Sequence, residues 1–130
     1  MNDFGMRKVL RATYDEALTR VPEALKTEGF GVLTEIDIAA TLKAKLGVDF
    51  RRYKIFGACN PPLAHRALTA ELEIGLMLPC NVIVYEGDDG RAVVAAIDPV
   101  RTIASVSVPA LTEIATTVRD KLQKVLALLE

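Results

Sequence analysis

Two periodicities alternate along the chain, and together they predict most of its elements. Runs in which apolar residues recur at every second position predict strands at residues 6–13, 30–37, 53–57, 80–86 and 91–97. Stretches with apolar residues three or four positions apart predict helices at 14–28, 38–46 and 61–75, and a last helix from Pro109 to the C-terminus. A short helical turn is expected after Asp98-Pro99.

The order of these elements predicts the fold class. The sequence Gly-Asp-Asp-Gly between residues 80–86 and 91–97 is strong turn chemistry, so these two strands should form an antiparallel hairpin. A strand, a helix, several strands with short helices between them and a long last helix indicate an α+β fold. We expect a two-layer domain over residues 1–130, with an antiparallel sheet and helices packed on one of its faces.

The stretch from Tyr53 to Glu86 holds the candidate chemistry, because it contains both cysteines and the only histidine. Gly57 is expected to end a strand, and Asn60-Pro61 is a strong helix start: asparagine caps open N–H groups, and proline at the first position has no N–H to leave unpaired. The apolar spacing carries this helix on to Gly75.

The first cysteine, Cys59, precedes the predicted helix start, where the positive end of the helix dipole favours a thiolate. His65 and Arg66 follow on the next turns, and His65 can lean back toward Cys59. Cys80 opens the next strand among apolar residues. The alternative reading is structural, since free cysteine usually packs as a small hydrophobe and a histidine at the edge of an apolar stripe is often only hydrogen-bonded.

Composition narrows the function classes. A net charge of −1, 5% aromatic residues and no tryptophan argue against nucleic-acid binding. No stretch is long enough for a membrane span, and no secretion signal is evident, so we expect a cytoplasmic protein with reduced thiols. Hydrophobic residues make up 51% of the chain, which is generous for this length and suggests a homodimer that covers a spare apolar face.

Three stretches resemble a known family: EGFGVLTEID, LGVDFRRYKIFGACNPPLAHRAL and GLMLPCNVIVYE. They are similar to the bacterial and archaeal family catalogued as domain of unknown function 302, from about Arg7 to Leu126. The resemblance implies an antiparallel sheet with helices on one face, in a β-α-β₄-α order like that of the TATA-binding protein, without its DNA function. The family has no established activity. The matching motif positions are Gly57, Cys59, Asn60, Pro61, Leu63, Ala64, Pro79 and Cys80.

These observations favour a binding module over an enzyme, since no nucleotide-binding loop, nucleophile elbow or metalloprotease motif is present and no cofactor is indicated. The first hypothesis is a site for a small anionic ligand or a protein partner at the Gly57–Asn60 turn. The second is thiol-based redox or sulfur-carrier chemistry with Cys59 as nucleophile and His65 assisting. The third is a metal site made of Cys59, His65 and Cys80. The candidate binding residues are Arg52, Gly57, Cys59, Asn60, Arg66 and Cys80.

Overall fold

The structure, a computed structural model, describes residues 4–104 and 106–130. Five strands, five α-helices and one short 3₁₀ helix follow one another in these residues. In chain order they are β1 (Gly5–Thr13), α1 (Tyr14–Thr27), β2 (Gly31–Asp37), α2 (Ile38–Leu46), β3 (Tyr53–Cys59), α3 (Pro61–Ala70), η1 (Leu72–Met77), β4 (Cys80–Glu86), β5 (Arg91–Ile97), α4 (Pro99–Ile103) and α5 (Pro109–Leu128).

The strands form one antiparallel sheet in the order β1-β5-β4-β3-β2. Each neighbouring pair is antiparallel, and β4 and β5 form the expected hairpin, with Val84 opposite Val94. Without the inserted helices, the element order is β-α-β₄-α. The α+β class and the one-sided arrangement of helices predicted from the sequence are confirmed.

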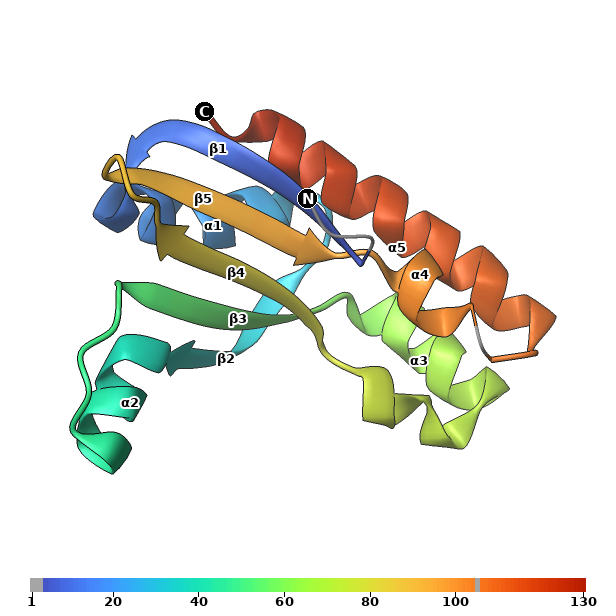
Figure 1. The fold of residues 1–130 in the computed structure, drawn as a ribbon. Helices are drawn as coiled ribbons and strands as arrows, with labels where there is room; N and C mark the ends of the chain where they lie inside the picture. The colour runs from blue at the N-terminus through green and yellow to red at the C-terminus, as the bar shows by residue number, and fades with distance from the viewer. Residues whose placement is uncertain (1–3, 105) are drawn as a thin grey trace.

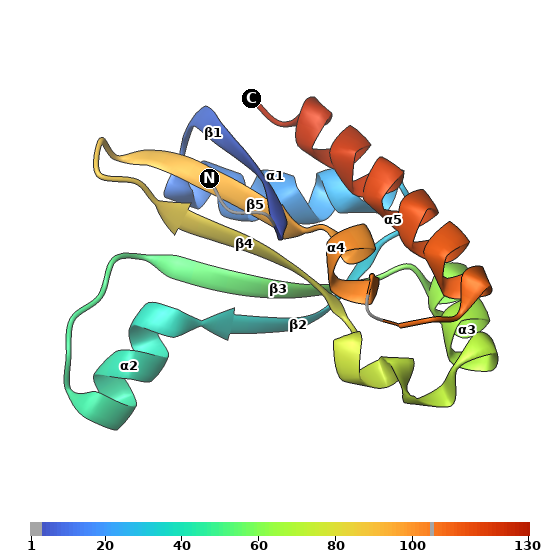
Figure 2. The same ribbon diagram turned by 45° about the vertical axis from the view of Figure 1, so that its right-hand side comes forward.

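Helices α1 and α5 cover one face of the sheet, and no helix of the described residues packs across the opposite face (Figure 1). The core lies between the sheet and these helices. Its largest fully buried side chains include Leu10, Leu25, Phe56, Leu111 and Leu122. Figure 2 shows α3, η1 and α4 gathered at one end of the sheet, beside the first half of α5. None of the helices in residues 4–104 and 106–130 combines the length and apolar composition that crossing a bilayer requires.

Local chemistry explains several element ends. The side chain of Thr13 accepts a hydrogen bond from the N–H of Glu16, and the Glu16 carboxylate accepts one from the N–H of Thr13, a capping box that starts α1. Helix α2 begins at the cap Asp37 and ends at Gly47, which has a left-handed φ of 68°. Both ends agree with the sequence prediction.

Two predicted boundaries were wrong. Strand β3 does not end at Gly57 but continues to Cys59, because Gly57 pairs with β2 on one side and β4 on the other. The helix that begins at Pro61 ends at Ala70 rather than at Gly75. Glu71 adopts an extended conformation there, and its carboxylate accepts a hydrogen bond from the N–H of Glu73 to start η1.

Strand β2 also departs from the predicted alternation. Val32 lies opposite Ala58, but Thr34 lies opposite the adjacent residue Gly57, so Leu33 is an extra residue in the strand. Such a β-bulge moves the following residues to the other face of the sheet. Val32 therefore packs against the core, whereas Ile36 is 45% exposed. The sequence pattern had placed both on one face.

Candidate functional site

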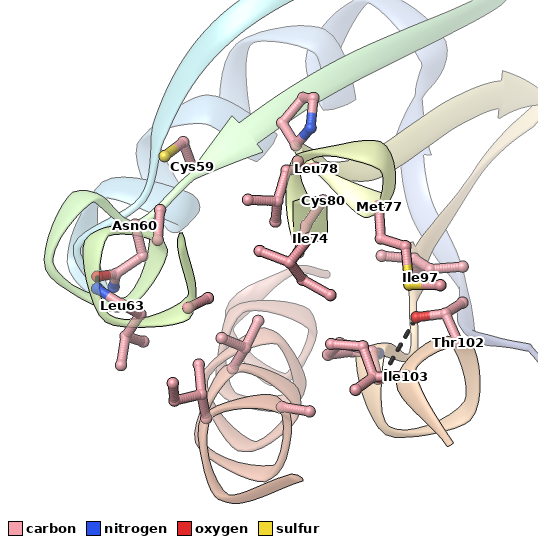
Figure 3. Close-up of a pocket in the computed structure, with 18 of the residues that line it drawn as sticks. Cys59, Asn60, Leu63, Ile74, Met77, Leu78, Cys80, Ile97, Thr102 and Ile103 are labelled. Carbon is pink, nitrogen blue, oxygen red and sulfur yellow. Dashed lines mark hydrogen bonds between the residues drawn. The ribbon is translucent and has the colours of Figure 1, made fainter. Parts of the chain in front are cut away.

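A cavity of about 590 Å³ lies at the end of the sheet where α3, η1, α4 and α5 meet. Figure 3 shows it bordered by α3, α5 and α4, with η1 and the start of β4 closing another side. The lining residues come from nearly every element after α1. They are Phe30, Leu33, Ala58, Cys59, Asn60, Leu63, Ala64, Ala67, Leu68, Ile74, Gly75, Leu76, Met77, Leu78, Pro79, Cys80, Asn81, Ile97, Pro99, Thr102, Ile103, Leu111, Ile114, Ala115 and Val118.

The cavity wall is mainly apolar, and its polar groups are few. Asn60 and Thr102 use their side chains elsewhere: Asn60 bonds to backbone groups, and the Thr102 hydroxyl donates to the carbonyl of Pro99. Asn81 is exposed at the edge. The remaining polar side chains in the wall are the thiols of Cys59 and Cys80, which form only weak hydrogen bonds. The cavity therefore suits a ligand surface that makes few hydrogen bonds.

Asn60 joins two helices at the wall of the cavity. Its Oδ1 accepts a hydrogen bond from the N–H of Leu63 at 3.4 Å, which caps α3, while Pro61 occupies the first helical position. Its Nδ2 donates to the carbonyl of Glu28 at 3.1 Å, just after α1. The side chain is buried, and both of its ends are occupied. Its observed role is structural, although the sequence had offered it as a binding residue.

The two cysteines lie close together and line the same cavity. Cys80 is directly opposite Ala58 on the neighbouring strand, and Cys59 is the residue that follows Ala58. Burial, and to a smaller extent the nearby Cys59, raise the pKa of the Cys80 thiol to about 11. In Figure 3 the Cys59 sulfur points away from Cys80. Both cysteines are free thiols.

The rim of the cavity is apolar as well. Leu33 in the bulge of β2 and Leu76 and Met77 in η1 line the cavity, yet they are 65%, 87% and 41% exposed. Large apolar side chains gathered at the mouth of an apolar cavity mark a place where an apolar molecule can enter or be partly held.

The other predicted site residues do not line this cavity. Arg52 precedes β3, at the end of the strand opposite Cys59, and it bonds to Asp15 and Glu86. Arg66 on α3 lies 3.9 Å from Glu113 of α5. His65 is exposed on α3.

Gly57 lies within the sheet, beside the cavity. A methyl group at this position would lie 2.2 Å from the hydroxyl oxygen of Thr34 and 2.8 Å from a ring carbon of Pro79. Glycine thus allows the side chain of Pro79 to approach β3, at the residue that leads into Cys80. Its contribution is close packing at the cavity wall.

The structure gives the metal hypothesis no support. Within the described ranges 4–104 and 106–130, no three histidine, cysteine, aspartate or glutamate side chains come together in a way that could hold a metal ion. Cys59 and Cys80 are neighbours, but the exposed His65 does not join them at the cavity.

Sequence reasoning missed the far walls of the cavity. Met77, Ile97, Thr102 and Ile103 line it, together with residues from the first half of α5. The available signal was the apolar run Leu76–Leu78, which the sequence analysis left between the predicted helix end at Gly75 and the strand that begins at Cys80. The α4 and α5 contributions carry no local signal, since only the tertiary fold brings them to β3 and β4.

Comparisons with known proteins agree with this architecture. Residues 6–129 match the model of the family described as domain of unknown function DUF302. A crystal structure of an uncharacterized conserved protein DUF302 from Bacillus stearothermophilus is similar, with a TM-score of 0.91 and 32% sequence identity, over 99% of this chain and 100% of that one. No curated protein matches the chain. The chain therefore belongs to the DUF302 family, as its sequence motifs predicted.

Proposed function

We propose that this protein is a binding module for a small, predominantly apolar ligand held in the cavity at the end of the sheet. The supporting observation is the apolar wall, in which the side chains of Asn60 and Thr102 are already bonded within the protein. The volume of about 590 Å³ falls in the range of about 300–1,000 Å³ typical of small-molecule sites.

This proposal modifies the ligand that the sequence suggested. An anionic ligand at residues 57–60 would need nearby cations, but Arg52 and Arg66 lie beside carboxylates and outside the cavity lining. Residues 57–59 also belong to β3, where their backbone groups take part in the sheet. The small-ligand part of the hypothesis is retained, and the ligand becomes apolar rather than charged.

Titration with Nile red, a neutral apolar dye whose fluorescence rises on transfer from water, tests the proposal. We compare Ala64→Phe, which places a ring in the cavity, with Ala70→Phe on the same helix, where the side chain is exposed and outside the cavity lining. The Ala64 variant should bind the dye at least about tenfold more weakly, a loss of about 1.4 kcal/mol. The Ala70 variant should bind like the wild type.

Thermal unfolding of both variants shows whether they remain folded under the assay conditions. If a folded Ala64→Phe protein binds the dye as the wild type does, or if the wild type binds none, the cavity is not the ligand site. Mass spectrometry of protein purified without denaturant adds a direct readout, since a co-purified apolar molecule should be lost from the Ala64 variant alone.

A second candidate function is thiol chemistry at Cys59, either redox or sulfur transfer. Its support is that both cysteines line one cavity on adjacent strands, so a molecule bound there would contact a free thiol. In the cytoplasm, which we propose as the location, both would stay reduced. His65 is exposed and outside the cavity lining, so this candidate relies on Cys59 without it.

A further inference from the structure

The wall of the cavity has the chemistry of an aliphatic chain. Its apolar side chains come from leucine, isoleucine, valine, alanine, methionine and proline, and Phe30 is the one aromatic residue among the described residues that line it. Within that same part of the chain, no charged side chain belongs to the lining. An aromatic ligand gains from contacts with other rings, which this wall offers at a single position. The wall therefore favours a ligand made of methylene groups over one made of aromatic rings.

Alanine residues at buried positions leave the space open. Ala58 of β3, Ala67 of α3 and Ala115 of α5 line the cavity and are 1%, 5% and 1% exposed. Protein interiors are close-packed, and vacant apolar space beside such positions lowers stability. An aliphatic ligand would supply the methylene groups that these alanines lack.

The exposure of the lining residues gives the cavity a direction. Leu76 of η1 and Leu33 of β2 are 87% and 65% exposed, whereas Leu111 and Ala115 of α5 are 0% and 1% exposed. Figure 3 shows α5 on the side of the space opposite Leu78, the residue that follows η1. The rim therefore lies beside β2 and η1, and the buried end of the cavity lies against α5.

A polar group of the ligand would bind poorly at the buried end. The residues of α5 that line the cavity are Leu111, Ile114, Ala115 and Val118, whose side chains form no hydrogen bonds. Burying a polar group without a hydrogen-bond partner is costly. At the rim the same group reaches water and the exposed Asn81. The polar part of the ligand should therefore stay at the rim.

We propose that the ligand is a single aliphatic chain with one polar end, held with its tail against α5 and its polar end at the rim. This inference rests on the proposed function and narrows it from any small apolar ligand to a chain-shaped amphiphile. Each methylene group that enters the cavity should strengthen binding about fourfold. A shorter cavity should therefore weaken the binding of long chains and leave that of short chains unchanged.

Displacement of Nile red by hexanol and by dodecanol, two uncharged straight-chain alcohols, measures this dependence on length. In Ala115→Leu the larger side chain shortens the cavity at its buried end. The ratio of dodecanol affinity to hexanol affinity should fall at least about tenfold, while hexanol affinity stays within about twofold of the wild type. Ala110→Leu is the matched control on the same helix, because Ala110 is exposed and outside the lining, and it should keep the wild-type ratio.

A milder variant covers the case in which Ala115→Leu does not fold, as judged by thermal unfolding. Val118→Ile adds a single methylene group at the same end of the cavity and should lower the ratio about fourfold. A folded Ala115→Leu or Val118→Ile protein that keeps the wild-type ratio, or that binds both alcohols more weakly by the same factor, overturns the placement of the tail.

The wild type separates this inference from the proposed function. If it binds Nile red but dodecanol does not displace the dye, the aliphatic chain is wrong and an apolar ligand of another shape remains. If it binds neither Nile red nor, by direct calorimetric titration, dodecanol, both proposals are overturned.

Discussion

The two cysteines share a cavity but differ in their environments. Cys80 is partly buried and the pKa of its thiol is raised to about 11, whereas Cys59 lies beside the capped start of α3. Because only the thiolate attacks an electrophile, Cys80 should be protonated at pH 8 in all but about one molecule in a thousand. We predict that Cys59 is alkylated faster than Cys80 at neutral pH.

The measurement is the alkylation rate of each single-cysteine protein, Cys59→Ser and Cys80→Ser, from pH 7 to pH 11. The protein that retains Cys80 should react slowly and accelerate up to about pH 11, because the fraction of thiolate rises until the pH passes the raised pKa. If this protein reacts as fast at pH 7 as the one that retains Cys59, the thiol candidate loses its physical basis.

Gly57 offers a test of packing at the cavity wall. In Gly57→Ala the added methyl group meets Thr34 at 2.2 Å and Pro79 at 2.8 Å, so the free energy of unfolding should fall by about 1–3 kcal/mol. Gly31→Ala is the matched control on β2, since no atom lies within 4 Å of the added methyl group. Urea denaturation measures the free energy of unfolding of both variants, and Gly57→Ala should be the less stable. Equal stability would show that Thr34 and Pro79 move aside at no cost in stability.

The two helix caps Thr13 and Asn60 should differ in importance because one of them also joins two helices. Thr13→Ala removes an exposed cap and should cost about 1 kcal/mol. Asn60→Ala removes a cap and also leaves the carbonyl of Glu28 without its donor, so we expect a loss of about 2 kcal/mol or more. Chemical denaturation of both variants measures the difference, and a smaller loss at Asn60 would contradict the joining role.

Elements whose signals are local could be predicted from the sequence. The start of α1 follows from its capping box, the end of α2 from Gly47, and the β4–β5 hairpin from its turn residues. The end of α3 could not be predicted, because η1 keeps the helical spacing of apolar residues after the extended Glu71. The bulge at Leu33 could not be predicted either, because one extra residue does not change the kinds of residue that a strand contains.

Only the part of the candidate site that lies within the stretch Tyr53–Glu86 could be predicted from the sequence. Cys59 and Cys80 were identified from the chain alone, and both line the cavity. The charged residues chosen beside them were not brought there, because strand direction places Arg52 at the far end of β3. Nothing in the sequence near the cysteines indicates that α4 and α5 complete the wall. That part of the site depends on long-range packing.

Helix α5 contacts both parts of the protein, reaching α1 and β1 on one side and α3 and α4 at the cavity. We therefore expect unfolding in a single cooperative transition. Leu122 is fully buried in this helix, so Leu122→Ala should lower the free energy of unfolding by about 2–5 kcal/mol. Leu128→Ala, at a 58% exposed position of the same helix, should change it by less than about 0.5 kcal/mol. Two separate transitions in a calorimetric scan would contradict this expectation.

The extra residue in β2 has a consequence for comparing family members. Leu33 contributes to the cavity rim, and the register that it shifts decides that Ile36 faces the open side of the sheet. Deleting this one residue would turn Ile36 back toward the helix side and remove a rim side chain in the same step. An alignment of relatives that retain the cavity should therefore show no gap at Leu33.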